Sequence, residues 1–320
     1  MHPYFLNLKT EDLKIKIHYE DLLLFSGSCF SENIATRLQS LMFDVYAQPN
    51  GTIFNPISIA EPITRIINYQ VYDENAIIQR DDLFFSKFHH GSFYAKDSSD
   101  LIKEINESLH LFETKLQKAK FLFLTFGSAF VYELTDSQEI VANCHKLPQN
   151  RFSKRLLSIQ EIEAVYQPIL KHLADVNPDL NVVLTVSPVK HLKDGIVENQ
   201  LSKSTLLLAI HQLKSTNPNV SYFPAYELVT DDLRDYRFYE NDGAHPNQLA
   251  IDYVFEKFKS TYFSEETRVY FDEQLNFQKL KNHKPIQEQG NAYEAWIKQV
   301  KEVKEKLNDK YSKKPIIRIY

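Results

Sequence analysis

Two residues that can act as nucleophiles, Ser28 and Cys29, follow a short apolar run at residues 22–26. The helical pattern after residue 30 places both side chains at a helix N-terminus, where unpaired N–H groups and the helix dipole favour negative charge. A thiol in such a place can have a lowered pKa and act as a nucleophile, and the same N–H groups can hold an oxyanion. The alternative is structural, because cysteine is often buried and Ser28 can cap the helix.

A second segment, residues 241–247, holds an aspartate three residues before a histidine, Asp242 and His245. An aspartate at this spacing can hydrogen-bond one ring nitrogen, which fixes the tautomer and stabilises the imidazolium. His245 would then be the general base for the nucleophile and the general acid for the leaving group. The alternative is a turn before a helix, in which Asp242 caps the helix and His245 has no chemical role.

The elements that must position these residues alternate along the chain. Short apolar runs typical of strands buried on both faces lie at residues 22–26, 121–126, 181–186 and 220–223. Helical patterns lie between and after them, at residues 34–42, 159–173, 204–213 and 249–258. This alternation predicts an α/β fold with a doubly wound, mostly parallel sheet flanked by helices. Ligands bind beyond the carboxyl ends of such strands, where the candidate residues fall.

Composition excludes several classes of partner. The net charge is −5 and no basic stripe is present, so we expect no nucleic-acid partner. The longest apolar runs are too short to span a bilayer, and residues 1–16 lack the apolar region of a secretory signal. Without an export signal, the two cysteines are expected to be free thiols in a cytoplasmic protein.

The composition changes near residue 267 to Lys, Glu, Gln and Asn. Five apolar residues there repeat at helical spacing and predict a helix with one apolar stripe: Tyr293, Trp296, Val300, Val303 and Leu307. We therefore expect a main domain at residues 1–262 and a helical C-terminal extension at residues 263–320. The stripe either packs back on the domain or forms a homodimer with another chain, and its spacing leaves both open.

Two histidines, His145 and His191, are expected on the same side of the sheet as the candidate site, as is Cys144. They could polarise a substrate or, with His245, bind a metal. Thiolate and imidazole are good zinc ligands. However, no paired spacing of such ligands supports a site, so we predict no metal and no cofactor. Aromatic residues before Asp242 could bind a sugar ring or wall the core, with equal support for each.

The two segments together resemble the first and last blocks of the SGNH/GDSL hydrolases. More closely, Gly27-Ser28-Cys29-Phe30 resembles the signature of the GSCFA-domain family, which is similar in fold to the SGNH hydrolases. Further motifs agree in order over about residues 20–260: Asn55-Pro56, Thr125-Phe126-Gly127, Asn143-Cys144-His145-Lys146, Ser187-Pro188-Val189-Lys190-His191, Asn199, Ser202-Lys203-Ser204, Tyr222-Phe223-Pro224-Ala225-Tyr226-Glu227 and residues 232–239. The resemblance implies an SGNH-like or flavodoxin-like sheet.

The resemblance also implies site residues, with departures. Cys29 stands at the serine-nucleophile position, so Cys29 is the first candidate nucleophile and Ser28 the second. The block that carries the SGNH asparagine corresponds to Gly127-Ser128-Ala129-Phe130, so that asparagine is absent. The remaining candidates for binding the oxyanion or substrate are Gly51, Asn55, Gly127, Asn143, His145 and His191.

The resulting expectation is a hydrolase or acyltransferase of the esterase type. It would act on a small-molecule or glycan ester, such as an acylated cell-envelope precursor, through an acyl-enzyme on Cys29 or Ser28. The substrate class rests on analogy with the family's fold. The alternative is a non-catalytic binding or interaction module that retains the fold. The missing asparagine and the cysteine in place of serine both favour this alternative.

Overall fold

The protein is described here by a computed structural model that covers residues 6–11 and 15–311. Residues 1–5 and 12–14, which belong to the segment predicted to lack a secretory signal, lie outside the described residues. Residues 312–320 of the expected extension do so as well. Within the described residues, no helix combines the length and the apolarity that crossing a bilayer requires.

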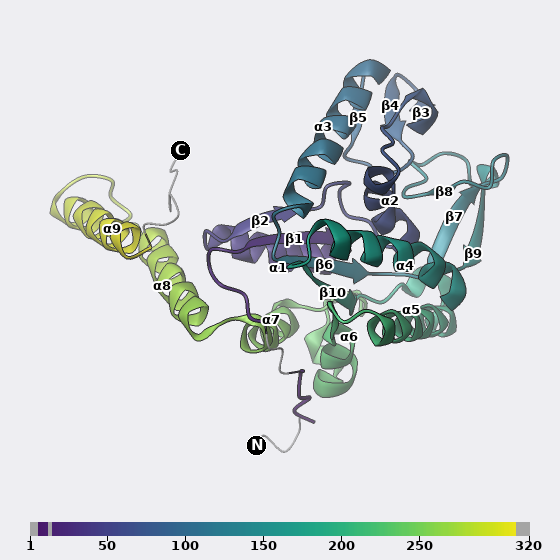
Figure 1. Ribbon diagram of the computed structural model, residues 1–320. Coiled ribbons are helices and arrows are strands. Elements are labelled where there is room, and N and C mark those ends of the chain that lie inside the picture. The colour runs from purple at the N-terminus through teal and green to yellow at the C-terminus, as the bar shows by residue number, and fades with distance from the viewer. Residues whose placement is uncertain (1–5, 12–14, 312–320) are drawn as a thin grey trace.

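A five-stranded parallel sheet forms the centre of the protein (Figure 1). In spatial order its strands are β11 (Val220–Phe223), β10 (Asn181–Val186), β6 (Phe121–Phe126), β1 (Leu22–Gly27) and β2 (Asp44–Ala47). The four predicted strands are confirmed, and β2 is an additional edge strand with an exposed first residue. The chain leaves β1 toward β2 on one side and later returns to β6 on the other. The order in which strands are added therefore reverses between β1 and β6. Open α/β sheets bind ligands at such a point.

Helices cover both faces of this sheet, which confirms the predicted doubly wound α/β fold. One face packs against α1 (Cys29–Ser40), α7 (Gln248–Tyr262) and α8 (Glu265–Asn282). The other face packs against α2 (Pro56–Ile67), α3 (Ser98–Leu116), α4 (Ile159–Val176) and α5 (Ile196–Thr216). Side chains alternate along each strand: Leu23 and Phe25 enter the first core and Leu24 the second. This burial on both faces explains the nearly continuous apolar runs.

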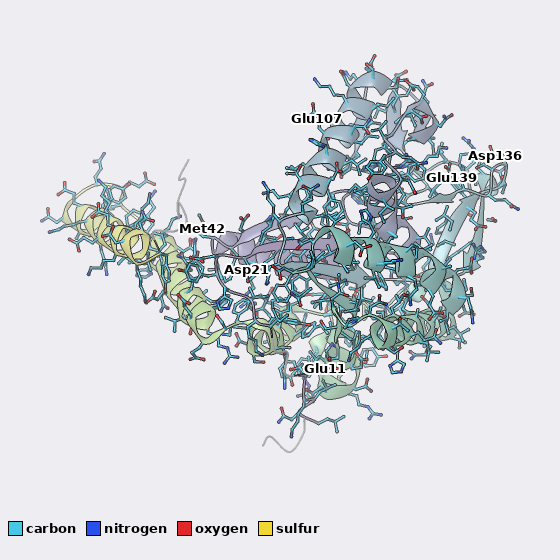
Figure 2. All side chains as sticks on the ribbon, viewed as in Figure 1. Glu11, Asp21, Met42, Glu107, Asp136 and Glu139 are labelled. Atoms are coloured by element: carbon cyan, nitrogen blue, oxygen red, sulfur yellow. The ribbon has the colours of Figure 1, made fainter. Side chains whose placement is uncertain are left out.

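Two small antiparallel sheets, which the sequence did not indicate, are inserted between the main elements. One consists of β3 (Ile77–Arg80), β4 (Leu83–Ser86) and β5 (Tyr94–Ala95), and packs on α3. The other consists of β7 (Phe130–Leu134), β8 (Ile140–Val141) and β9 (Phe152–Leu156), between β6 and α4. Figure 2 labels Asp136 and Glu139 in the hairpin of this second sheet, far from Asp21 and Met42 at the amino-terminal edge of the main sheet.

Short helical turns fill the remaining connections. Single 3-10 turns lie at Glu74–Ala76, Gln149–Arg151, Leu192–Asp194 and Tyr236–Phe238, and α6 (Ala225–Glu227) continues into a π-helical turn at Leu228–Leu233.

The C-terminal helices form an arm that extends from the main body (Figure 1). The apolar stripe of α9 (Asn291–Lys310) packs back on α8 within the same chain: Trp296 Nε1 donates to the Leu280 carbonyl at 2.9 Å, and Leu307 is buried. In turn, Tyr270 and Phe271 of α8 belong to the core under α1 and α7. The predicted homodimer through this helix and the domain boundary at residue 262 stay predictions.

A buried histidine in the β4 region predicts how stability depends on pH. Burial lowers the pKa of His89 from 6.5 to about 3, so His89 stays neutral in the folded protein while it protonates in the unfolded chain. Stability is therefore lost as the pH falls below 6.5, by about 2 kcal/mol between pH 7 and pH 5. Urea unfolding at the two pH values should show that His89→Gln removes this part of the pH dependence. His110 is exposed and provides the control: His110→Gln should leave the pH dependence of stability unchanged. Equal pH dependence in the wild type and both variants would contradict the role assigned to His89.

Candidate functional site

The turn after β1 is held by hydrogen bonds on both sides. The Ser28 N–H donates to the Thr125 carbonyl at 3.1 Å, and the Gly27 carbonyl accepts from the Ile53 N–H at 2.9 Å. Gly27 has a φ of +128°, and a Cβ there would lie 2.2 Å from the Thr125 carbonyl oxygen. Only glycine fits this place between β1 and β6. The turn is therefore fixed at the point where the strand order reverses, between β1 and β6.

Ser28 and Cys29 both stand at the start of α1, as the sequence predicts. Ser28 is the N-cap residue, but its side chain makes no capping hydrogen bond. Its hydroxyl is buried and has no hydrogen-bond partner among the described residues. The side chain of Ser28 therefore does not cap α1, which was the structural alternative for this residue. Cys29 is the first helical residue, a free thiol with a partly exposed side chain.

The surroundings of Cys29 act on its thiol in opposite directions. Burial raises its pKa above the usual 9 and is the largest effect. The backbone N–H groups of Phe30 and Cys29 and the ammonium of Lys203 lower the pKa, whereas the carboxylate of Glu32 raises it. In the resting protein the thiol is therefore mostly protonated at neutral pH. A nucleophilic role for Cys29 consequently requires a base that takes its proton.

Asp242 and His245 form the hydrogen-bonded pair that their spacing suggested. His245 Nδ1 lies 2.5 Å from one carboxylate oxygen of Asp242, and the other oxygen accepts the N–H groups of His245 at 3.0 Å and Ala244 at 2.8 Å. These backbone and side-chain hydrogen bonds lower the pKa of Asp242 to about 2. The carboxylate therefore stays charged at neutral pH and holds the ring in one orientation.

The loop that carries this pair is tied to the carboxyl end of β10. The Lys190 N–H donates to the Ala244 carbonyl at 3.1 Å. The Lys190 ammonium lies over the rings of Tyr239 at 3.8 Å and Tyr236 at 4.7 Å from the centroids. Tyr236 is an exposed ring. These contacts place the histidine loop on the same edge of the sheet as the turn after β1.

A groove lies between α1 and α7, and Cys29 is among the residues that line it, whereas Asp242 and His245 are not. Cys29 and Glu32 line it on one side, and Gln248, Ile251 and Asp252 on the other. Its α7 side begins three residues after His245. In the part of the chain that the structure describes, no hydrogen bond joins His245 Nε2 to Ser28 or Cys29. The candidate nucleophile and the candidate base therefore lie on the same edge of the sheet with no hydrogen bond between them.

Three candidate oxyanion donors make hydrogen bonds within the fold. The Gly51 N–H donates to the Gln48 carbonyl at 2.9 Å, and the Gly127 N–H donates to the Phe54 carbonyl at 2.7 Å. Asn55 is the N-cap of α2: its amide oxygen accepts from the Ser58 N–H and its amide nitrogen donates to the Ser58 hydroxyl. The N–H groups of Gly51 and Gly127 are therefore not free for an oxyanion, whereas the amide nitrogen of Asn55 has a second N–H that the hydrogen bond to Ser58 does not use. The N–H groups of Cys29 and Phe30, at the start of α1, remain.

Asn143 and His145 lie against the small sheet that contains β4. His145 is buried, and its Nε2 lies 2.7 Å from the Ser86 carbonyl. Asn143 accepts the His145 N–H at 2.8 Å. Within the described residues, no group of three or more His, Cys, Asp or Glu side chains could hold a metal ion. These contacts tie both residues to the small sheet.

His191 does lie at the edge of the main sheet. Its ring meets the ring of Phe54 edge to face, with 5.9 Å between centroids, and its backbone N–H donates to the Asn199 side chain. Burial, and next the charge of Lys203, lower its pKa to about 4, so the ring is neutral at pH 7. Its Nε2 is buried without a hydrogen-bond partner among the described residues.

Sequence reasoning assigned no role to one residue at this edge, Lys203 on α5. It is completely buried, and its ammonium donates to the carbonyls of Gly127 at 2.6 Å and Ser187 at 2.7 Å. A signal for it exists in the sequence. Lys203 shares helical spacing with the buried Leu206 and Ile210, which places a lysine on an otherwise apolar face.

Comparisons with known proteins match this chain to a family. The family model described as the GSCFA family matches residues 22–258. The chain matches no curated protein sequence. A solved structure of a proposed platelet activating factor from Streptococcus pneumonia is 12% identical with a TM-score of 0.39, over 75% of this chain and 83% of that one. A carbohydrate esterase family 3 structure from Talaromyces cellulolyticus is 9% identical with a TM-score of 0.35, over 78% and 99%. Similarities this weak carry no argument about function.

Proposed function

This chain belongs to the GSCFA family, and we propose that it is an esterase-type enzyme that transfers acyl groups from esters to water or to an alcohol. The observation that carries the proposal is the Asp242–His245 pair, held by three hydrogen bonds on the sheet edge where α1 presents Cys29. An oriented imidazole near a thiol at a helix N-terminus is the arrangement that nucleophilic acyl transfer requires.

In the proposed reaction, His245 Nε2 takes the thiol proton while Cys29 Sγ attacks the ester carbonyl carbon. The N–H groups of Cys29 and Phe30 stabilise the oxyanion. The carbon–oxygen bond then breaks, His245 returns the proton to the leaving alkoxide, and a thioester remains on Cys29. Water or a second alcohol, deprotonated by His245, attacks the thioester and releases Cys29. Asp242 keeps its charge and orients the ring throughout.

The step that needs the imidazole near the thiol requires movement of one of the two segments. Hydrogen bonds of catalytic groups are often long in the resting enzyme and shorten when substrate binds. The side chains of Asp242 and His245 are about half exposed, so the pair is not fixed by burial. We propose that substrate in the groove between α1 and α7 brings the ring toward Cys29.

For the substrate we propose a small-molecule or glycan ester. The exposed ring of Tyr236 stands beside the loop of His245, where a flat aromatic face can stack on a sugar. Hydrolysis of acetylated sugars should therefore exceed hydrolysis of simple acetate esters, and this preference should be lost in Tyr236→Ala.

The chain offers a matched pair of thiols to test the nucleophile, because Cys29 and Cys144 are both free and partly exposed. We expect Cys29→Ala to abolish hydrolysis of p-nitrophenyl acetate and formation of a covalent acyl-enzyme detected by mass spectrometry. Cys144→Ala should retain both. If Ser28→Ala instead abolishes both and Cys29→Ala does not, the nucleophile is Ser28.

A second candidate function is a binding module without catalysis. The lack of a hydrogen bond between His245 and either nucleophile in the described residues favours it. The same experiment separates the two functions. If no acyl-enzyme forms, and Cys29 reacts with iodoacetamide no faster than Cys144 at any pH, the module is correct and the enzyme is not.

A further inference from the structure

Gln48 directly follows β2, and its side chain contacts the turn that leads to Cys29. The backbone N–H of Gln48 donates to the Phe25 carbonyl at 2.8 Å, as in a regular parallel ladder. The next hydrogen bond of such a ladder would run from the Gly27 N–H to the backbone carbonyl of Gln48. The side chain takes the place of that carbonyl, because Oε1 accepts the Gly27 N–H at 3.0 Å. A side chain therefore completes the pairing at the end of β1.

The backbone of Gln48 explains why a side chain occupies this place. Its φ is +56°, in the left-handed region that residues other than glycine adopt only at a cost in free energy. The chain turns away from β1 there, and the Gln48 carbonyl accepts the Gly51 N–H at 2.9 Å and not that of Gly27. A glutamine held in such a conformation beside a candidate nucleophile indicates that its side chain has a function there.

The other end of the amide reaches the peptide group that precedes the thiol. Gln48 Nε2 donates a long hydrogen bond, 3.4 Å, to the Ser28 carbonyl. The same carbonyl accepts the N–H groups of Ser31 at 2.9 Å and Glu32 at 3.3 Å, at the start of α1. The Ser28 carbonyl and the Cys29 N–H belong to one planar peptide group. Contacts to this carbonyl therefore fix the direction of the Cys29 N–H and polarise it as a donor.

We propose that Gln48 is a positioning residue of the oxyanion site, and that its amide holds the peptide between Ser28 and Cys29 so that the Cys29 N–H is directed at the oxyanion. This inference deepens the proposed function and rests on Cys29 as the nucleophile. When Sγ attacks the ester, the bond between Sγ and the carbonyl carbon forms, and the electron pair of the carbonyl double bond moves to oxygen. A donor stabilises that charge only if it is already oriented toward it.

Two reactions of the same thiol separate this role from a purely structural one. Acylation by p-nitrophenyl acetate passes through an oxyanion and therefore depends on the Cys29 N–H. Alkylation by iodoacetamide displaces iodide from a saturated carbon, so no oxyanion forms. A variant that misdirects the peptide should slow acylation and leave alkylation unchanged. A variant that disturbs the whole turn should change both rates.

Two variants of Gln48, made in the full chain, remove the amide in different ways. Gln48→Met keeps the length of the side chain without its hydrogen bonds. Gln48→Gly removes the side chain and favours the left-handed backbone, so it decides the test if the first variant does not fold. We expect both variants to lower kcat/KM for p-nitrophenyl acetate by about 10–100-fold. Alkylation of Cys29 at the same pH, read by peptide mass spectrometry, should keep the wild-type rate.

Gln138 provides the matched control. It is an exposed glutamine that also has a left-handed backbone, with a φ of +58°, in the hairpin between β7 and β8. Gln138→Met and Gln138→Gly should keep the wild-type rates of both reactions. These variants separate the effect of the backbone conformation from that of the amide beside Ser28.

Three results would contradict the inference in different ways. Equal loss of acylation and alkylation in the Gln48 variants would show that Gln48 only supports the turn, and the proposal would be overturned. Wild-type acylation in both variants would overturn it as well, because the amide would then have no part in the oxyanion site. A wild-type protein that forms no acyl-enzyme would instead overturn the proposed function itself, and this inference with it.

Discussion

Replacing His245 with alanine should lower kcat/KM for ester hydrolysis by a factor of about 10²–10⁴, the usual contribution of a general acid–base group. The reason is that burial keeps the thiol of Cys29 protonated at neutral pH, so attack depends on a base. Asp242→Asn should also lower the rate, because an amide can donate to the ring and hold the wrong tautomer. Steady-state kinetics with p-nitrophenyl acetate measure both effects.

The exposed His110 on α3 gives the matched control, since His110→Ala removes an imidazole far from the site. We expect this variant to keep the wild-type rate. High pH should partly rescue His245→Ala, because the thiolate then forms without a base. A His245→Ala enzyme with full activity at neutral pH would remove His245 from the mechanism, and the base would have to be found elsewhere.

The second large effect concerns stability. Gly27→Ala should lower the free energy of unfolding by about 3–5 kcal/mol, at the upper end for single substitutions. The new Cβ would lie 2.2 Å from the Thr125 carbonyl oxygen, in a backbone conformation that side chains rarely adopt. That oxygen also accepts the Ser28 N–H, so the turn that holds Cys29 must move. Chemical denaturation measures the stability.

Gly290 separates the two causes of this loss. It also has a left-handed φ, +93°, but no atom lies within 4 Å of the added Cβ. Gly290→Ala should therefore cost only about 1–2 kcal/mol, from the backbone conformation alone. Equal losses in the two variants would show that the contact with Thr125 has little effect.

The sequence predicted the parallel sheet well because its strands are buried on both faces. Residues 121–126 and 181–186 are continuous apolar runs, and the observed β6 and β10 have the same bounds. The small antiparallel sheets gave no such signal. β5 and β8 have two residues each, and their pairing depends on distant segments that the sequence does not bring together. Such elements are defined by tertiary contacts and not by local pattern.

The sequence likewise predicted one part of the candidate site and not the rest. Asp242 and His245 are three residues apart, and their hydrogen bond follows from that spacing. The loops at Gly51 and Gly127 looked equally suitable, but their N–H groups bind carbonyls of other loops. No local pattern reveals such a partner. Lys203 could have been recognised from its place on the apolar face of α5, but a lysine on a helix is usually assigned to solvent.

The aromatic cluster around Tyr19 has a consequence for protein synthesis. The Tyr19 ring stacks on Tyr270 at 4.8 Å and meets Tyr311 edge to face at 5.0 Å. Residue 17 likewise pairs with Phe263. The part of this core that α7 and α8 contribute therefore forms only after these helices, more than two hundred residues after α1, have been translated. Nascent chains of this protein should depend on chaperones that shield apolar surface until the last helices emerge.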